Sequence, residues 1–319
     1  MPILAIVGGV ALFIIISVLI TSYVCYRKTF YSPPRDQKKK KDDPSVKRVA
    51  STLESYHSVI GDWKRRVSSL ECQEVSVTSF DGLKLYGKYF EYKKGAPIEI
   101  LFHGYRGSAE RDMDGGVIRC LSKGRNALAI DHRASGRSEG KVISFGINES
   151  KDCISWVNYV IENIDRDAKI IITGISMGAA TVMIAAGKEE LPENVVAALA
   201  DCGYTSSKEI IMKTVGEMKL PPKIMYPFIK LGARIFGGFN IDEVSPIESV
   251  ARSKIPIIFI HGDVDDFVPH SMGKRNYEAC TTEKRFVTIE GAGHATAFLV
   301  DSELYLTEIE DFFGKQLNK

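Results

Sequence analysis

The sequence has 319 residues, of which 45% are hydrophobic and 26% are charged, and its formal net charge is +2. These proportions are typical of a globular protein and exclude collagen-like, low-complexity and wholly disordered chains. The small net charge argues against a nucleic-acid binder, so no nucleic-acid partner is expected. The six cysteines include no CxxC pair. Neither a disulfide framework nor a zinc site is therefore expected.

Residues 1–26 contain no charged side chain and are dense in isoleucine, leucine and valine. A helix rises about 1.5 Å per residue and the hydrocarbon core of a bilayer is about 30 Å thick, so this run is long enough to cross it. The alternative is a cleaved signal peptide, which would have a basic first region and a small-residue cleavage site. Neither feature is present, and the sequence predicts a retained transmembrane anchor.

Residues 27–48 form a basic juxtamembrane linker with nine basic and three acidic residues. Such clusters are retained in the cytoplasm, so the rest of the chain is expected there, attached to the cell membrane by a single N-terminal span. The run Lys38–Lys41 could suggest nucleic-acid binding. Beside a membrane span, anionic lipid headgroups are the simpler partner for the linker.

Residues 49–319 read as one α/β domain. Residues 49–66 have the pattern of an amphipathic helix, and residues 74–78 and 84–92 alternate around Asp81-Gly82, as a β-hairpin does. Short apolar runs then recur with helical patterns between them, which predicts a mostly parallel, doubly wound sheet. Functional side chains are expected just after the carboxyl ends of its strands. The predicted buried strands are residues 98–102, 127–130, 170–172, 195–200, 257–260 and 286–289.

The segment Gly174-Ile175-Ser176-Met177-Gly178 follows one of these strands and precedes a helical pattern. A nucleophile on so sharp a strand-to-helix turn needs a strained backbone, and glycines two positions away on either side avoid steric clashes. The alternative is an ordinary tight turn with a chance serine. The position of the motif between strand and helix favours Ser176 as a catalytic nucleophile.

A serine nucleophile needs a base, and the base needs an orienting carboxylate. Of the six histidines, His294 alone occupies the loop after the last predicted strand, so it is the predicted base; the alternative is an ordinary surface-loop histidine. The acid is expected between Ser176 and His294 at a strand end. Four aspartates fit that description and the spacing does not choose among them: Asp201, Asp263, Asp265 and Asp266.

The tetrahedral intermediate of acyl transfer also requires two backbone N–H donors, which form an oxyanion hole. The predicted strand 98–102 ends in His103-Gly104-Tyr105-Arg106-Gly107, a turn that lies near the nucleophile in such a sheet. The backbone amides of Tyr105 and Met177 are the expected pair.

These motifs, in this order, resemble those of the α/β-hydrolase superfamily over roughly residues 70–317. The motifs are His103-Gly104-x-x-Gly107, Asp131-x-Arg133-x-x-Gly136-x-Ser138, Gly174-x-Ser176-x-Gly178, His261-Gly262-x-x-Asp265-x-x-Val268-Pro269 and Gly293-His294. The resemblance implies the α/β-hydrolase fold, Asp265 as the acid, and serine hydrolysis without a metal or organic cofactor. More narrowly, the chain resembles membrane-anchored bacterial hydrolases related to the serine aminopeptidase-like and dipeptidyl-peptidase-like branches.

About fifty residues, 204–253, separate two predicted strands, and they are apolar and helical in character. An insertion here predicts a helical cap that covers a small-molecule or lipid-like ester substrate. The expected function is carboxylic ester hydrolysis. Two alternatives stay open: an aminopeptidase-like amide hydrolase, and a catalytically silent membrane-bound interaction domain.

Overall fold

The computed structural model describes residues 2–33 and 44–318. Its centre is an eight-stranded sheet in the order β1-β2-β4-β3-β5-β6-β7-β8, in which the pairs β1–β2 and β2–β4 are antiparallel and the other neighbours are parallel. Each predicted buried run is a strand, and the predicted doubly wound sheet is confirmed. The strands are β1 Gln73–Thr78, β2 Lys84–Phe90, β3 Ile98–Phe102, β4 Asn126–Ile130, β5 Ile170–Ile175, β6 Val195–Asp201, β7 Ile257–Gly262 and β8 Lys284–Ile289.

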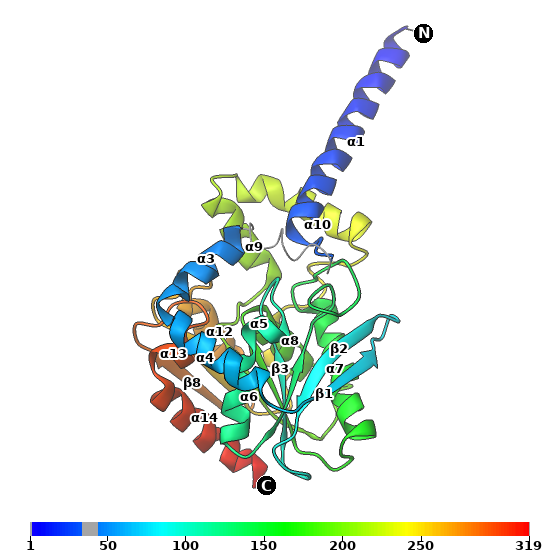
Figure 1. Cartoon of the computed structure of the whole chain (residues 1–319). Coiled ribbons are helices and arrows are strands. Elements are labelled where there is room, and N and C mark those ends of the chain that lie inside the picture. The colour runs from blue at the N-terminus through cyan, green and yellow to red at the C-terminus, as the bar shows by residue number, and fades with distance from the viewer. Residues whose placement is uncertain (1, 34–43, 319) are drawn as a thin grey trace.

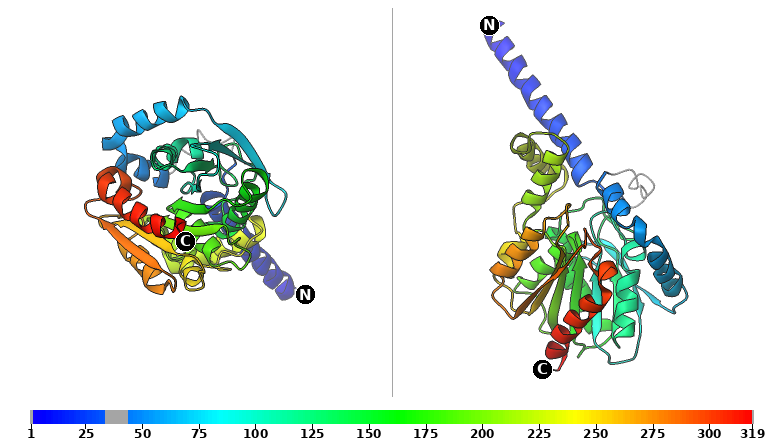
Figure 2. Two further views of the ribbon diagram at one scale, coloured as in Figure 1. Left: turned by 90° about the horizontal axis from the view of Figure 1, so that it is seen from below. Right: turned by 90° about the vertical axis from the view of Figure 1, so that its left-hand side faces the viewer.

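Helices cover both faces of this sheet (Figures 1 and 2). On one face, Trp156 and Met183 belong to an apolar core shared with the strands, and both are fully buried. On the other face, Phe312 and Phe313 fill the corresponding position. The first face is covered by α7 Ile147–Asn163, α8 Met177–Ala186 and α12 His270–Ala279, and the second by α6 Asp114–Ser122 and α14 Ser302–Leu317, with the short helices α5 Ala109–Asp112 and α13 Ala297–Val300.

A buried ion-pair network joins the second helical layer to the sheet. Glu99 of β3 is fully buried and pairs with Arg119 of α6 and with Arg125, which also pairs with Glu310 of α14. Burial opposes ionisation of Glu99, but the two guanidinium groups outweigh it and lower the pKa of the carboxyl to about 2. Because the loss of one partner would leave a buried charge uncompensated, the network holds α6 and α14 in a single arrangement.

Residues 49–66 were expected to form one helix, but the structure has a break there. Helix α3 (Pro44–Thr52) is followed by a 3-10 turn (Glu54–Tyr56) and by α4 (His57–Ser68). The change of direction lets Trp63 of α4 stack on Phe298 of α13, with ring centroids 5.3 Å apart, while Trp63 also contacts Gly115 of α6. Tertiary packing of one tryptophan therefore overrides the local helical pattern.

The N-terminal helix α1 (Pro2–Thr29) projects from one end of the molecule (Figure 1). Its segment Ile6–Thr29 is long and apolar enough to cross a membrane, and most of it is exposed, whereas Ser22, Cys25 and Tyr26 near its end are buried. Arg27 and Lys28, expected in the linker, lie in the last turn of α1, where cations interact favourably with the helix dipole. The middle of the predicted linker, residues 34–43, which includes Lys38–Lys41, lies outside the described residues.

The segment between β6 and β7 is helical and lies at the same end of the molecule as α1 (Figure 2). It contains α9 (Ser207–Glu217), α10 (Pro222–Phe236) and α11 (Pro246–Val250). Ser206 and Ser245 cap α9 and α11, since each side chain accepts a hydrogen bond from the backbone three residues on. This is the segment for which a cap was predicted.

Candidate active site

Ser176 lies at the sharp turn between β5 and α8. Its backbone has a φ of 56°, a left-handed value that a non-glycine residue rarely adopts. A Cβ atom at Gly174 would lie 2.1 Å from the carbonyl carbon of Gly178, and one at Gly178 would lie 2.0 Å from the carbonyl oxygen of Phe102. Both glycines are therefore required sterically, as the sequence predicted, and the turn holds the Ser176 side chain above the sheet edge.

The imidazole of His294 lies between Ser176 and Asp265. Its Nε2 is 2.9 Å from the Ser176 hydroxyl oxygen, and its Nδ1 is 2.8 Å from a carboxylate oxygen of Asp265. All three residues are less than one-tenth exposed. The three predicted side chains thus form one continuous line of hydrogen bonds, although 118 positions separate Ser176 from His294.

The carboxylate of Asp265 is held by several donors besides His294. Its Oδ1 accepts hydrogen bonds from the backbone amides of Phe267, at 3.0 Å, and Val268, at 2.8 Å. The Nε2 of His261 lies 3.3 Å from its Oδ2. Burial opposes ionisation, but the hydrogen bonds from His261 and His294 outweigh it and hold the pKa of Asp265 below its usual range. The carboxylate is therefore ionised near neutral pH and can stabilise a protonated His294.

The contact between His261 and Asp265 was not predicted from the sequence. Its Nε2 faces two acceptors, the Asp265 carboxylate and the Val268 carbonyl oxygen at 2.8 Å, so the ring proton belongs on Nε2. The signal was available, because His261 and Asp265 stand four residues apart in the motif that assigns the acid. His261 positions the Asp265 carboxylate. Its Nε2 contacts Asp265 and the Val268 carbonyl oxygen, and not Ser176.

The other aspartates that fitted the sequence pattern have different partners. Asp201 accepts a hydrogen bond from the Tyr305 hydroxyl at 3.1 Å, and burial raises its pKa to about 6. Asp263 accepts from the Gly291 amide, and the exposed Asp266 pairs with Arg48. Of these four aspartates, Asp265 is the one that is hydrogen-bonded to His294.

The loop of Tyr105 adjoins the nucleophile turn. A Cβ atom at Gly104 would lie 3.6 Å from the Cβ of Ser176, so the backbone before Tyr105 passes beside the serine. Met177 is the first residue of α8, where N–H groups have no acceptor within the helix. The two amides predicted for the oxyanion hole therefore come from adjacent segments.

The Asp131–Ser138 loop has a structural role in this arrangement. The Asp131 carboxylate accepts hydrogen bonds from the amides of Ala109 and Arg137, each at 2.9 Å. Arg133 pairs with Asp152 of α7 and with Asp81 of the β1–β2 turn. These bonds fix the loop beside the sheet edge and contribute no group to the line of hydrogen bonds at Ser176.

The apolar side chains of the cap face in two directions. Ile210, Ile211 and Val215 of α9 are buried in a core that also contains Met177 and Phe145. Met218 and Leu220, by contrast, are exposed to solvent. Only the inward set can line a roof over Ser176, so the predicted acyl-binding roof uses part of the apolar composition of the cap.

A metal ion is a possible alternative occupant of the site. Among the described residues, one group of potential ligands is close enough to hold an ion: Cys202, Asp265 and His294, whose ligand atoms lie within 4.8 Å of one another. Burial raises the pKa of the Cys202 thiol well above its usual range, so it is a poor metal ligand near neutral pH. Because His294 and Asp265 already bond to each other, the arrangement favours proton transfer over metal binding.

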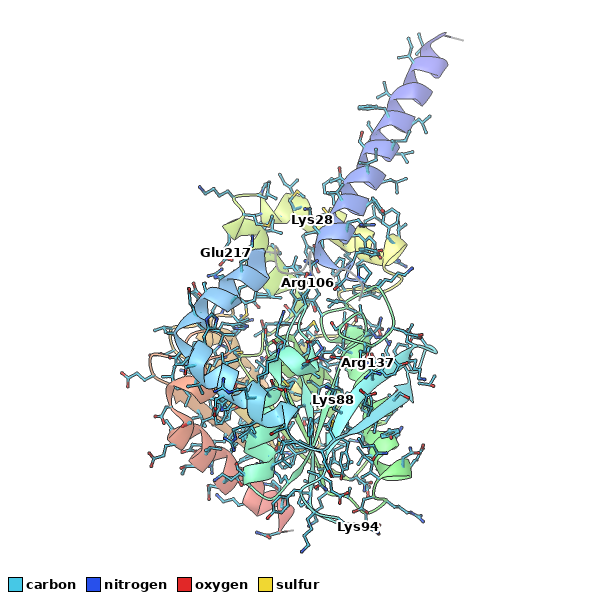
Figure 3. The ribbon with its side chains drawn as sticks, in the orientation of Figure 1. Lys28, Lys88, Lys94, Arg106, Arg137 and Glu217 are labelled. Atoms are coloured by element: carbon cyan, nitrogen blue, oxygen red, sulfur yellow. The ribbon has the colours of Figure 1, made fainter. Side chains whose placement is uncertain are left out.

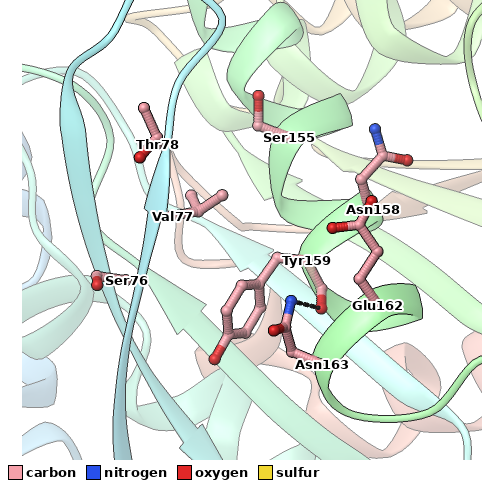
Figure 4. Close-up of a pocket in the computed structure, with 8 residues that line it drawn as sticks. All are labelled: Ser76, Val77, Thr78, Ser155, Asn158, Tyr159, Glu162 and Asn163. Atoms are coloured by element: carbon pink, nitrogen blue, oxygen red, sulfur yellow. Dashed lines mark hydrogen bonds between the residues drawn. The ribbon is translucent and has the colours of Figure 1, made fainter.

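A second place where a ligand could bind is a hollow of about 440 Å³ between β1 and α7 (Figure 4). Its lining includes Ser76, Thr78, Asn158, Tyr159 and Glu162. The residues that line this hollow include no histidine that could activate a nucleophile, and none of them belongs to the Ser176 site. The hollow therefore does not compete with Ser176 as the reaction centre.

Comparison with known proteins gives the same fold. The family described as "alpha/beta hydrolase fold" matches residues 100–229. The chain is 29% identical to the uncharacterized protein YqkD of Bacillus subtilis over 193 residues. These residues make up 60% of this chain and 63% of YqkD. It is 22% identical to the protein bem46 of Schizosaccharomyces pombe, over 70% of each chain. The match to YqkD thus covers a little less than two thirds of its length.

Solved structures share the fold. The esterase Pf2001 of Pyrococcus furiosus superposes with a TM-score of 0.64 at 24% identity, over 78% of this chain and 92% of that one. An acylaminoacyl peptidase of Pyrococcus horikoshii gives a TM-score of 0.58 at 17% identity, over 83% of this chain and 44% of that one. The narrower branch named from the motifs stays a prediction. The family match and these neighbours show that the chain has the α/β-hydrolase fold that its motifs predict.

Proposed function

We propose that this protein is a serine hydrolase that cleaves carboxylic esters through an acyl-enzyme. The α/β-hydrolase fold supports hydrolase activity. The observation that carries the finer proposal is the line of hydrogen bonds from Asp265 through His294 to Ser176, at 2.8 and 2.9 Å. Such a line supplies a nucleophile, a base and an orienting carboxylate in hydrogen-bonding contact.

In the proposed reaction, the Ser176 oxygen attacks the acyl carbon while its proton moves to Nε2 of His294. Asp265 stabilises the imidazolium that forms, because it is ionised and bonded to Nδ1. The amides of Tyr105 and Met177 donate to the oxyanion. His294 then returns the proton to the leaving alcohol, and a water molecule releases the acid by the same steps. A positioned base contributes roughly 10²–10⁴-fold and one oxyanion donor roughly 10²–10³-fold.

Replacing Ser176 with alanine should abolish covalent labelling by a fluorophosphonate probe, because the attacking oxygen is removed. The fold should persist, since the substitution leaves the backbone turn and its glycines unchanged. The measurement is probe labelling of the full chain in detergent, with circular dichroism to check folding. Ser249→Ala, at a buried serine of α11, is the matched control and should label like the wild type. Undiminished labelling of Ser176→Ala would remove Ser176 from the mechanism, and an unlabelled wild type would favour the silent interaction domain.

The alternative aminopeptidase-like activity would require free carboxylates in the cap to bind the amino group of a substrate. The acidic side chains there have partners already. Glu209 pairs with Arg275, Asp242 with Lys230, and Glu243 with Lys151. This pairing favours a neutral acyl substrate over an amine-bearing one. The inward apolar face of the cap supports a medium-to-long acyl chain, and a lipid-like ester drawn from the adjacent bilayer fits that face.

Substrate preference separates these possibilities. A panel of p-nitrophenyl esters of increasing acyl length, assayed beside aminoacyl anilides, should show ester turnover with kcat/KM rising with chain length. The physical reason is burial of each added methylene, worth about 0.8 kcal/mol, or roughly fourfold in kcat/KM, where the cap removes it from water. Faster cleavage of the anilides would reverse the ranking of the two activities. Turnover confined to the shortest esters would contradict a lipid-like substrate.

We also propose that α1 is a retained anchor in the cell membrane, with the hydrolase domain in the cytoplasm. The end of α1 and the residue that follows it are part of the domain: Cys25, Tyr26 and Phe30 are buried in the same core as Tyr226 of the cap. The Tyr105 hydroxyl donates to the Thr29 carbonyl at 2.8 Å. Cleavage near Tyr26, as of a signal peptide, would expose this apolar surface. The basic residues after α1 support the cytoplasmic orientation and a contact with anionic headgroups.

The anchor is tested by fractionating cells that express the full chain. The protein should remain in membranes after an alkaline carbonate wash, and its intact mass should correspond to all 319 residues. The reason is that a spanning helix is removed from the bilayer only by detergent, whereas a peripheral contact is lost at high pH. A soluble, shortened product that lacks the first 26 residues would contradict the proposal.

A further inference from the structure

Helix α10 has apolar side chains on two opposite faces. The inner face carries Tyr226, Ile229 and Ala233, which are buried in the core shared with α1 and the active-site loops. A helix of the usual geometry turns about 100° per residue, so these positions share one face. This packing accounts for the inner half of the helix.

The outer face of α10 carries a second apolar stripe. It consists of Ile224, Phe228, Leu231 and Ile235, at positions i, i+4, i+7 and i+11, about 180° from the inner face. Ile224 is 62% exposed and Ile235 is 50% exposed, while Phe228 and Leu231 are half-buried, Phe228 partly against the core shared with α1. We call these four residues the outer stripe. A soluble helix would place polar residues there, so the outer stripe calls for an apolar environment.

The loop before α10 extends this apolar surface. Between α9 and α10, Met218 and Leu220 are 60% and 42% exposed. Lys219, in the same loop, has a φ of 61° and an exposed side chain. The side chains of Lys223 and Arg234, on one flank of α10, are exposed as well. The result is an apolar surface bordered by cations, the composition of a helix that lies at the surface of an anionic membrane.

The contact between α1 and α10 fixes where this surface lies relative to the span. A Cβ atom at Gly232 would lie 2.4 Å from the carbonyl oxygen of Ser22, so the two helices touch backbone to backbone there. The rings of Tyr23 and Phe236 pack edge to face with centroids 5.1 Å apart. From Ser22 onward, α1 is therefore covered on one side by the cap.

The part of α1 beyond this contact has the length of a bilayer core. The 19 residues from Pro2 to Ile20 extend about 28 Å at about 1.5 Å per residue, against a hydrocarbon thickness of about 30 Å. A bilayer placed on this segment ends at the level of α10. Lys28 and Glu217, at the ends of α1 and α9, lie at this end of the molecule, and Lys94 lies at the opposite end (Figure 3).

We propose that the outer stripe of α10 and the loop at Met218–Leu220 insert into the interface of the leaflet that α1 enters, with Lys223 and Arg234 against anionic lipid headgroups. The domain then has two attachments to the bilayer, the span and the cap, and they hold the roof of the Ser176 site against the membrane surface. The inference rests on the proposed anchor and not on the proposed catalytic role of Ser176.

Depth-dependent quenching tests this insertion in the full chain. Cys72 is exposed and the other five cysteines are buried, so Cys72→Ser removes the accessible native thiol. In that background, Ile224→Cys is labelled with an environment-sensitive fluorophore and reconstituted into phosphatidylcholine–phosphatidylglycerol vesicles that contain a doxyl-labelled lipid. Tyr92→Cys is the matched control, because Tyr92 is 56% exposed and near Lys94 in sequence, away from the span. The label at 224 should be quenched several-fold more strongly than the label at 92.

Equal quenching at the two positions would overturn the proposal. A second outcome would also overturn it: the label at 224 is shielded from water, no lipid quencher reaches it, and the shielding grows with the protein-to-lipid ratio. A second copy of the chain would then cover the outer stripe. Fluorophosphonate labelling of Ser176, scored on the same vesicles, keeps the two proposals apart: quenching at 224 with no labelling would retain the membrane contact and reject the hydrolase.

Discussion

Two hydrogen bonds, one between Asp265 and His294 and one between His294 and Ser176, are the constraint on which the rest of the arrangement depends. They join three loops at the carboxyl ends of β5, β7 and β8, which a parallel sheet brings to one edge. Close backbone contacts make this possible. Gly262, for example, admits the carbonyl of Ala292 where a Cβ atom would lie 2.0 Å away, and so brings the loop of the acid against the loop of the base.

The end of α1 belongs to the roof of this site as well as to the proposed anchor. Thr29 accepts a hydrogen bond from Tyr105, the residue whose amide is proposed for the oxyanion hole, and the carbonyl of Lys28 accepts one from Arg106. Movement of the span against the domain would therefore disturb the turn beside Ser176. This connection gives a physical reason for the proposed anchor and the proposed reaction centre to lie at the same edge of the sheet.

Local patterns predicted much of the fold and the site. Runs such as Ile98–Phe102 are continuous in apolar residues because both faces of the strand are buried, and the glycines around Ser176 reflect a steric need that leaves a local signature. The break within residues 49–66 left no such signature, since it depends on Trp63 meeting Phe298. The contact of Ser22 with Gly232 was equally hidden, because it joins residues 210 positions apart. Four aspartates fitted the strand-end pattern; the motif resemblance singled out Asp265, and the three-dimensional geometry places that carboxylate against His294.

The kinetics of Asp265→Asn in the full chain test the central claim most directly. Asparagine has nearly the same shape but no charge, so kcat should fall by a factor on the order of 10⁴ with little change in KM, as when an orienting carboxylate is lost from a serine hydrolase. Asp263→Asn, two residues away with its carboxylate on the Gly291 amide, should keep nearly full kcat. Wild-type kcat in Asp265→Asn, or a comparable loss in Asp201→Asn alone, would contradict the account.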